Sequence, residues 1–221
     1  MSNKTYGQLC PLARSLDVLG DRWTLLIIRE LLLGPKRFKN LLSALPAMGT
    51  NRLSERLNML VENGVIQQVT PSAASSGSAY ELTALGEQLR KPLLELSLWG
   101  LSVPIDERID PATARADLIM LCLTAAVDPA LVADLQEIYE FQVGSEIFHV
   151  SVDHGAVMPR SGPSPTPADL KIYCDMEILQ GLVMGQIEPE QARLDGLVHL
   201  LHGDQETFKR VFKILHYNPQ K

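Results

Sequence analysis

Cysteine is scarce in this sequence, and its three copies show no spacing typical of a metal site or a disulfide framework. Cys10, Cys122 and Cys174 are odd in number and far apart, and no CxxC or Cys/His pattern accompanies them. Unpaired thiols persist in reducing compartments. We therefore expect a cytoplasmic protein without a metal ion.

Long apolar runs are also missing. No stretch reaches the roughly 18 to 20 apolar residues that a membrane-spanning helix needs, and residues 1–9 are polar, unlike a secretory leader. Hydrophobic residues make up 46% of the chain and charged residues 21%, which is the composition of a globular protein. We expect no membrane partner.

Catalytic motifs are absent from the sequence as well: it contains no GxGxxG, no P-loop and no GxSxG. His149 and Asp153 share one face of a predicted strand, but no nucleophile motif accompanies them. His199 and His202 are three residues apart, which suits a helix rather than the strand predicted there, and no further ligand completes a site. We therefore expect no catalytic residues and no cofactor, and we predict that the protein is not an enzyme.

Positive charge is unevenly distributed along the chain. The net charge is −6, yet residues 1–100 hold eleven Lys and Arg against eight Asp and Glu, a balance of +3. Residues 101–221 hold nine against eighteen, a balance of −9. This asymmetry predicts two domains with different partners, at residues 1–101 and 102–221.

Residues 36–82 contain the most informative pattern, which begins with a short amphipathic helix at residues 37–45. Pro46 ends this helix. Its apolar residues recur at i, i+3, i+4 and i+7: Phe38, Leu41, Leu42 and Leu45.

A second helix begins at Thr50 or Asn51, and Asn63-Gly64 provides its C-terminal cap. Its apolar residues form one stripe: Leu53, Leu57, Leu60 and Val61. The opposite face carries polar, mostly hydrogen-bonding side chains: Asn51, Arg52, Glu55, Asn58 and Met59. Side chains of this kind can read base edges in the major groove.

Two β-biased runs follow at residues 65–69 and 79–82, and small residues at 70–78 join them like the tip of a wing. A helix, a tight turn, a second helix and a wing in this order predict a DNA-binding unit. The alternative is a simple packing unit whose polar stripe is only solvated.

Further helices are predicted on both sides of this unit. Residues 10–20 form a helix with Pro11 in its first turn and Gly20 just past its end. Residues 25–33 are apolar nearly all round and form the buried spine. Residues 83–99 form one long helix whose apolar stripe exceeds the needs of a small domain, so we interpret it as a dimer helix. Core packing is the alternative.

Several motifs in residues 8–100 carry a resemblance to a known family. They are Cys-Pro-Leu at 10–12, Gly-Asp-Arg-Trp-Thr-Leu-Leu-Ile-Ile-Arg-Glu-Leu at 20–31, Gly-Pro-Lys-Arg-Phe at 34–38, Leu-Ser-Glu-Arg-Leu at 53–57, Tyr-Glu-Leu-Thr at 80–83 and Trp-Gly at 99–100. With these motifs the segment resembles the HxlR family of bacterial winged-helix transcriptional regulators.

The resemblance implies a homodimer whose second-motif helix enters the major groove of a palindromic double-stranded DNA operator. Residues 65–82 contain no Lys or Arg, so the positive charge near DNA must come from outside the wing. The candidate DNA-binding residues are Lys36, Arg37, Lys39, Thr50, Asn51, Arg52, Glu55, Arg56, Asn58 and Met59.

Cys10 is a candidate redox sensor, because some members of the family carry such a thiol at this position. The dipole of the helix that begins there favours a thiolate. The alternative is an inert structural cysteine, since no second cysteine lies nearby in this domain to resolve a sulfenate.

After a linker punctuated by prolines at residues 103–111, the second half mixes helices and strands. We predict helices at 112–127, 128–137, 176–184, 189–193 and 205–215, and strands at 138–143, 147–152, 169–174 and 197–202.

This half resembles the sterol-carrier-protein-like fold, in which helices cover an antiparallel sheet around an apolar tunnel. Residues 138–152, 167–172, 185–189 and 196–204 carry the resemblance. It implies a pocket for an apolar small-molecule ligand, lined by Phe141, Phe148, Met176, Leu179, Leu182, Val183 and Phe212. Ordinary core packing is the alternative for each of these residues.

The predicted fold class is therefore α+β, with an N-terminal winged helix-turn-helix domain and a C-terminal α/β sandwich-like domain. The predicted function is that of a homodimeric transcriptional regulator whose second domain senses an apolar ligand or adds dimer surface. Two alternatives stay open: a DNA-binding dimer whose second domain is only a scaffold, and a lipid carrier or enzyme domain with a vestigial reader.

Overall fold

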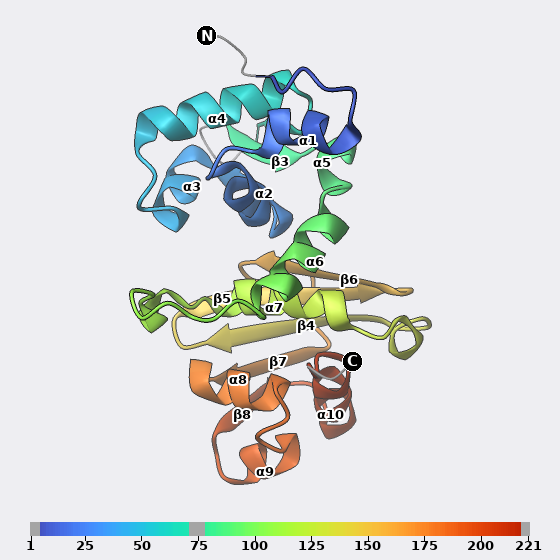
Figure 1. Cartoon of the computed structure of the whole chain (residues 1–221). Coiled ribbons are helices and arrows are strands. Elements are labelled where there is room, and N and C mark those ends of the chain that lie inside the picture. Colours follow the sequence, from blue (N-terminus) through green and yellow to red (C-terminus); the bar gives the residue numbers. More distant parts are fainter. Residues whose placement is uncertain (1–4, 71–77, 218–221) are drawn as a thin grey trace. The chain divides into compact units, whose positions relative to one another are not determined.

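The computed structural model describes residues 5–70 and 78–217, and the chain forms two compact units, Met1–Leu93 and Leu94–Lys221 (Figure 1). Each unit has its own secondary structure and is described by itself. The predicted wing tip at residues 70–78 lies mostly outside the described residues, which resume at Ser78.

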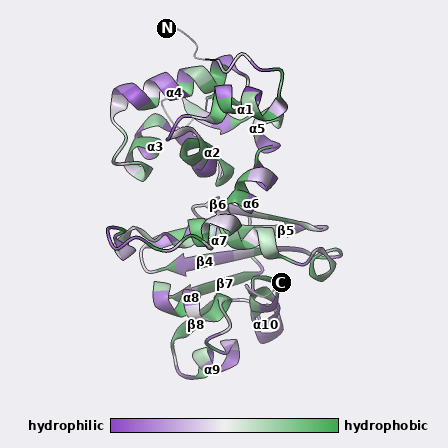
Figure 2. Cartoon of the chain, viewed as in Figure 1, coloured by the Kyte–Doolittle hydropathy of each residue, from purple (hydrophilic) through white to green (hydrophobic). Residues whose placement is uncertain are grey.

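The first unit begins with α1 (Pro11–Leu19) and α2 (Thr24–Leu32). As predicted, Pro11 occupies the first turn of α1, where its missing N–H costs nothing, and Gly20 follows the helix. Ile27, Ile28 and Leu31 of α2 are at most 1% exposed, so α2 is the spine of this unit. Figure 2 shows the matching contrast in hydropathy, because α2 is rich in apolar residues whereas hydrophilic residues recur along α4.

The predicted helix-turn-helix is confirmed as α3 (Phe38–Ala44) and α4 (Thr50–Glu62). The wing consists of β2 (Ile66–Val69) and β3 (Ala79–Leu82), paired antiparallel. The sequence pattern missed β1 (Lys36–Arg37), which adds to β3 as an edge strand and gives the sheet the order β1-β3-β2. A two-residue strand is too short to show an alternating pattern.

The segment after the wing forms two helices, α5 (Ala84–Glu87) and α6 (Arg90–Gly100), so the single long helix predicted there is wrong. Pro92 gives the physical reason, because in a continuous helix its ring would clash with the carbonyl of residue 88. Gly86 lies so close to the wing that an added Cβ would be 2.1 Å from the carbonyl oxygen of Val65. This contact fixes α5 against the end of the hairpin.

The second unit begins with short helices where two longer ones were predicted. They are η1 (Pro111–Thr113), α7 (Ala116–Leu123), η2 (Thr124–Ala126) and η3 (Pro129–Leu131). The helix predicted at 128–137 is wrong, because the backbone N–H groups of His154 and Gly155 donate to the carbonyls of Leu135 and Val132. These bonds come from a distant turn and hold the segment out of a helix.

The second unit contains a five-stranded sheet with the order β6-β5-β4-β7-β8. Its strands are β4 (Gln136–Val143), β5 (Glu146–Asp153), β6 (Ala156–Ser161), β7 (Leu170–Cys174) and β8 (Val198–His202). The sheet was predicted to be antiparallel, but β4 and β7 pair in parallel. Since β6 and β7 run in the same direction, residues 162–169 must cross the sheet to join them.

Three helices complete the second unit: α8 (Met176–Val183), α9 (Pro189–Leu194) and α10 (Gln205–Ile214). Their apolar residues and those of α7 share one buried cluster with alternate residues of the strands, such as Tyr139, Phe141 and Phe148. The core therefore lies between one face of the sheet and the helices. Among the described residues no helix is long and apolar enough to cross a membrane.

Candidate nucleic-acid interface

Helix α4 separates an apolar face from a polar face. Leu53, Leu57 and Leu60 are fully buried, and each such leucine contributes roughly 1.5 to 3 kcal/mol to stability. Asn51 and Asn58, on the opposite side at ~100° per residue, are exposed. Val61 was predicted to belong to the apolar stripe, but it is 39% exposed at the edge of the buried face.

The ends of α4 are defined by local geometry. Gly49 precedes the helix in an extended conformation. At the other end the side-chain amide of Asn63 donates to the carbonyl of Met59 at 2.8 Å, and Gly64 adopts a φ of +68°. A left-handed φ of this kind is accessible to glycine without strain. The length of the polar face is thereby fixed.

The turn before α4 sets its angle to α3. Leu45 and Met48 are buried, and the N–H of Met48 donates to the carbonyl of Leu45 at 2.9 Å. Leu41 of α3 is fully buried as well. Three buried side chains and a closed turn make α3 and α4 a rigid pair.

Two of the predicted DNA-binding cations are engaged in ion pairs inside the unit. The Lys36 ammonium lies 3.8 Å from the carboxylate of Glu30, which is fully buried and also accepts a hydrogen bond from Arg29 at 2.7 Å. The Arg56 guanidinium lies 3.1 Å from Glu55 and 3.6 Å from Asp21. Both cations therefore neutralise the protein's own carboxylates.

The remaining predicted residues are more accessible. Lys39, Thr50, Arg52 and Glu55 are exposed, and Arg37 is half-buried at the start of α3. Met59 is half-buried beside the polar stripe. The structure thus brings the α4 candidates together on one surface.

The wing carries neutral amides and a carboxylate over its described part. Gln67 donates to Glu81 at 2.7 Å, and Gln68 donates to the hydroxyl of Tyr80 at 3.1 Å. Both pairs join β2 to β3. These hydrogen bonds hold the strands together. Neither strand contains Lys or Arg, so neither offers a cation to a phosphate.

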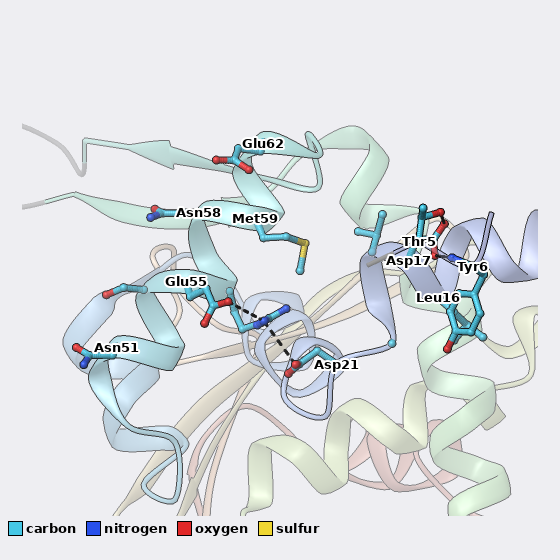
Figure 3. A pocket seen from close by; sticks show the side chains of 14 residues that line it. Thr5, Tyr6, Leu16, Asp17, Asp21, Asn51, Glu55, Asn58, Met59 and Glu62 are labelled. Carbon is cyan, nitrogen blue, oxygen red and sulfur yellow. Dashed lines mark hydrogen bonds and ion pairs between the residues drawn. The ribbon is translucent and has the colours of Figure 1, made fainter. Parts of the chain in front are cut away.

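A cleft of about 1130 Å³ lies between α4 and the N-terminal segment that leads into α2. Its lining residues are Thr5, Tyr6, Leu16, Asp17, Val18, Gly20, Asp21, Asn51, Ser54, Glu55, Arg56, Asn58, Met59 and Glu62. Figure 3 shows Met59 extending from α4 into the space on the side of α1. The sequence did not predict this cleft, because its walls are far apart along the chain.

Comparison with known proteins assigns the first unit. Residues 18–106 match the family described as HxlR-like helix-turn-helix. The HTH-type transcriptional regulator YvaP of Bacillus subtilis is 35% identical over 106 residues, which cover 48% of this chain and 94% of YvaP. The chain belongs to the HxlR-like helix-turn-helix family.

Other similar proteins include a further regulator and a solved structure. The HTH-type transcriptional regulator sll1512 of Synechocystis is 33% identical over 94 residues, covering 42% of this chain and 70% of the relative. The crystal structure of PA1607 is 36% identical, covers 47% of this chain and 72% of its own, and has a TM-score of 0.42. Each match covers less than half of this HxlR-like chain. The protein is a transcriptional regulator of the helix-turn-helix type. The family match ends at residue 106, so most of the second unit lies outside it.

Cys10 of this HxlR-like chain is exposed and directly precedes α1, as the motif predicted. The other two thiols are in the second unit. Burial raises the pKa of Cys174 to about 12, with a smaller contribution from Asp175, and burial also raises the pKa of Cys122. Both thiols are therefore held in the unreactive protonated form. The redox role of Cys10 stays a prediction.

The predicted ligand-binding residues of the second unit lie together, but in a packed core. Phe141, Phe148, Leu179, Leu182, Val183 and Phe212 are at most 3% exposed. The rings of Phe141 and Phe148 stack with centroids 5.0 Å apart, and Met176 packs against the same cluster. Among the described residues no group of three or more His, Cys, Asp or Glu side chains could hold a metal ion.

Proposed function

We propose that the protein reads double-stranded DNA through the outward face of α4, as a cytoplasmic transcriptional regulator. The supporting observation is the division of α4 into three buried leucines and an exposed face with Asn51, Glu55 and Asn58. Amides can pair with adenine and carboxylates with the amino group of cytosine in the major groove. A rigid α3–α4 pair allows such a face to be inserted as one body.

Phosphate contacts come from a smaller set of cations than the sequence suggested. Lys39 and Arg52 are exposed and have no ion-pair partner among residues 5–70 and 78–217, and Arg37 is half-buried directly before α3. Lys36 and Arg56 act instead on the protein's own carboxylates. We therefore assign positioning on the DNA backbone to Lys39, Arg52 and Arg37.

Replacement of Glu55 by Ala should relax the sequence preference at one position of the site without unfolding the protein. One base contact contributes about 1 to 3 kcal/mol of discrimination. Arg52→Ala should instead weaken binding to every sequence and flatten its salt dependence. The measurement is selection from a random duplex library, followed by fluorescence anisotropy at several salt concentrations.

The matched control is Lys213→Ala, which removes an exposed cation from α10 in the other unit. It should bind the selected duplex as the unchanged protein does. If Glu55→Ala and Arg52→Ala also behave as the unchanged protein, α4 is not the reading helix.

We propose further that the chain acts as a homodimer on a palindromic operator. Large apolar side chains are exposed on α6, with Trp99 66% exposed and Leu96 48% exposed. A patch of this kind is typical of an interface. Leu96→Asp combined with Trp99→Asp should convert the dimer into a monomer in sedimentation, and half-site affinity should persist. If the protein with both substitutions is still a dimer, α6 does not form the interface.

For the second unit we propose a sterol-carrier-like domain, whose role is either to sense an apolar ligand or to act as a scaffold. The packed core favours the scaffold, because a ligand would have to displace stacked rings. Titration of the full chain with a fluorescent fatty-acid analogue decides between them. Saturable binding that Leu182→Trp abolishes would support sensing, whereas the absence of binding would leave the scaffold.

A further inference from the structure

The cleft beside α4 carries an excess of negative charge. Among the residues that the structure describes, four carboxylates line it, those of Asp17, Asp21, Glu55 and Glu62, against the single guanidinium of Arg56. Arg56 is already close to Glu55 and Asp21. Glu62 has no ion-pair partner among the described residues. Concave surfaces with charge of one sign concentrate ions of the opposite sign.

A second property of the cleft is its apolar and aromatic surface. Tyr6, Leu16, Val18 and Met59 line it together with the carboxylates. Tyr6 is held in place because its backbone N–H and the hydroxyl of Thr5 donate to the two carboxylate oxygens of Asp17, at 2.8 and 2.9 Å. A phenol ring attracts a cation through its π face, and a thioether adapts to an apolar body. The lining therefore suits a molecule that is both cationic and apolar.

The third property is the position of the cleft on the reading surface. Asn51, Glu55, Asn58 and Met59 are candidate DNA-binding residues, and all four line the cleft (Figure 3). A helix in the major groove has its outward face against the base edges. A molecule resting on these side chains occupies the space that the bases need.

We propose that this cleft is an effector site for an organic cation with an aromatic or alkyl body, and that its occupant prevents DNA binding. The second part of the inference rests on the proposed DNA-reading role of α4. The effector acts by direct competition, so no conformational signal from the second unit is required. By linkage, DNA must lower the affinity for the cation by the same factor as the cation lowers the affinity for DNA.

The chemistry of the lining disfavours other classes of small molecule. An anion such as a carboxylate or phosphate would face four like charges with one cation already in contact with two of them. A neutral hydrocarbon would desolvate Glu62 and Asp17 without a compensating charge. A cation with an apolar body satisfies both parts of the surface.

Isothermal titration of the full chain with tetraphenylphosphonium tests the site without DNA. Tetraphenylborate, of the same shape and opposite charge, is the matched control ligand. We expect the cation to bind at least about tenfold more tightly than the anion. Glu62→Gln should weaken cation binding about fivefold, the size of one close charge contact in water.

Glu177→Gln is the matched protein control, because Glu177 is an exposed carboxylate on α8 in the other unit. It should leave the cation affinity unchanged. Tyr6→Ala should also weaken cation binding, because the aromatic surface is lost. Equal binding of the two ions, or equal effects of Glu62→Gln and Glu177→Gln, would overturn the site.

A competition experiment then tests the link to DNA. Tetraphenylphosphonium should displace the selected duplex. Glu62→Gln should raise the tetraphenylphosphonium concentration needed for displacement about fivefold, the same factor by which it weakens cation binding in the titration. Simultaneous binding of cation and duplex would overturn the proposed competition. The existence of the cation site would then rest on the titration alone. If no duplex is ever bound, the proposed function fails, and the titration alone decides whether the cation site exists.

Discussion

In the N-terminal unit helix α4, the turn before it and the wing are consecutive along the chain, whereas the central strand pair of the C-terminal unit joins residues 139 and 170. The first arrangement is specified by local signals such as Pro46, Asn63 and Gly64. The second depends on a crossover at residues 162–169 that no local signal specifies. Function can therefore be assigned from sequence most directly where the structure is local.

The two units also differ in how their candidate sites are built. The surface of α4 is exposed and polar and is backed by buried leucines, so it is available to a partner without rearrangement. The predicted pocket residues of the second unit are themselves the core. A ligand could reach them only at the expense of packing that stabilises the unit. The cleft beside α4, by contrast, has an open volume of about 1130 Å³.

The largest expected effect separates the two units by stability. Phe141→Ala removes a fully buried ring that stacks on Phe148 at 5.0 Å, and it should destabilise the second unit by about 3 to 5 kcal/mol. Hydrogen exchange measured by mass spectrometry should show loss of protection in β4, β5 and β7. Protection of α2 should be unchanged.

The matched control is Ile147→Ala, because Ile147 is an exposed apolar residue on β5. This substitution should change the stability of the second unit little. If α2 loses protection in Phe141→Ala as much as β4 does, the two units unfold as one cooperative body and the comparison fails.

A smaller effect is expected in the first unit from Glu30→Ala. Glu30 is fully buried and pairs with Arg29 at 2.7 Å and Lys36 at 3.8 Å. Its removal leaves two partly buried cations without their carboxylate, which should cost about 2 to 3 kcal/mol. Because Arg29 is 27% exposed, we expect less than for a wholly buried pair.

Urea denaturation measures this loss, and hydrogen exchange should place it in α2 and β1. The substitution Glu95→Gln on α6 is a control, since Glu95 is exposed. A Glu30→Ala protein as stable as the original would mean that Lys36 is not needed as a counterion, and would make it available for DNA.

Most elements of both units could be predicted from the sequence, and the exceptions have physical causes. Periodic leucines and glycine or proline signals predicted α3, α4 and the wing. The break between α5 and α6 was missed although Pro92 is a local signal for it. The parallel pairing of β4 with β7 could not be read from strand patterns, because alternation shows which residues share a face and not which strand is adjacent.

The candidate site was predicted unevenly for a similar reason. Exposure of Asn51 and Asn58 follows from their phase on α4 relative to the buried Leu53 and Leu57. The engagement of Lys36 with Glu30 does not follow, because it depends on how β1 packs against α2. The cleft was missed because Asp17 and Glu62 are brought together only by the tertiary fold.

The smallest expected effect concerns acid stability in the second unit. Asp204 precedes α10, and one of its carboxylate oxygens accepts a hydrogen bond from the N–H of Thr207 at 2.8 Å. This bond, made to the charged form, lowers the pKa of Asp204 below its usual value. A lowered pKa in the folded state means that the carboxylate stabilises the fold above the pKa of the unfolded chain. The contribution is lost as pH falls through the lower folded pKa.

Asp204→Asn should therefore be less stable than the original protein near neutral pH, because an amide accepts the same bond without the charge that favours a helix N-terminus. The difference should shrink as the pH falls through the lowered pKa of Asp204, because the carboxylate then becomes protonated. Thermal unfolding followed at several pH values measures it, with Glu177→Gln as a control that removes a carboxylate from α8. A difference that stays constant down to pH 3 would show that the cap acts through its shape alone. In that case the acid sensitivity of the second unit would come from other carboxylates, among them Glu140, whose pKa is lowered despite the opposing effect of burial, through its bonds to the N–H of Ser164 and the ammonium of Lys171.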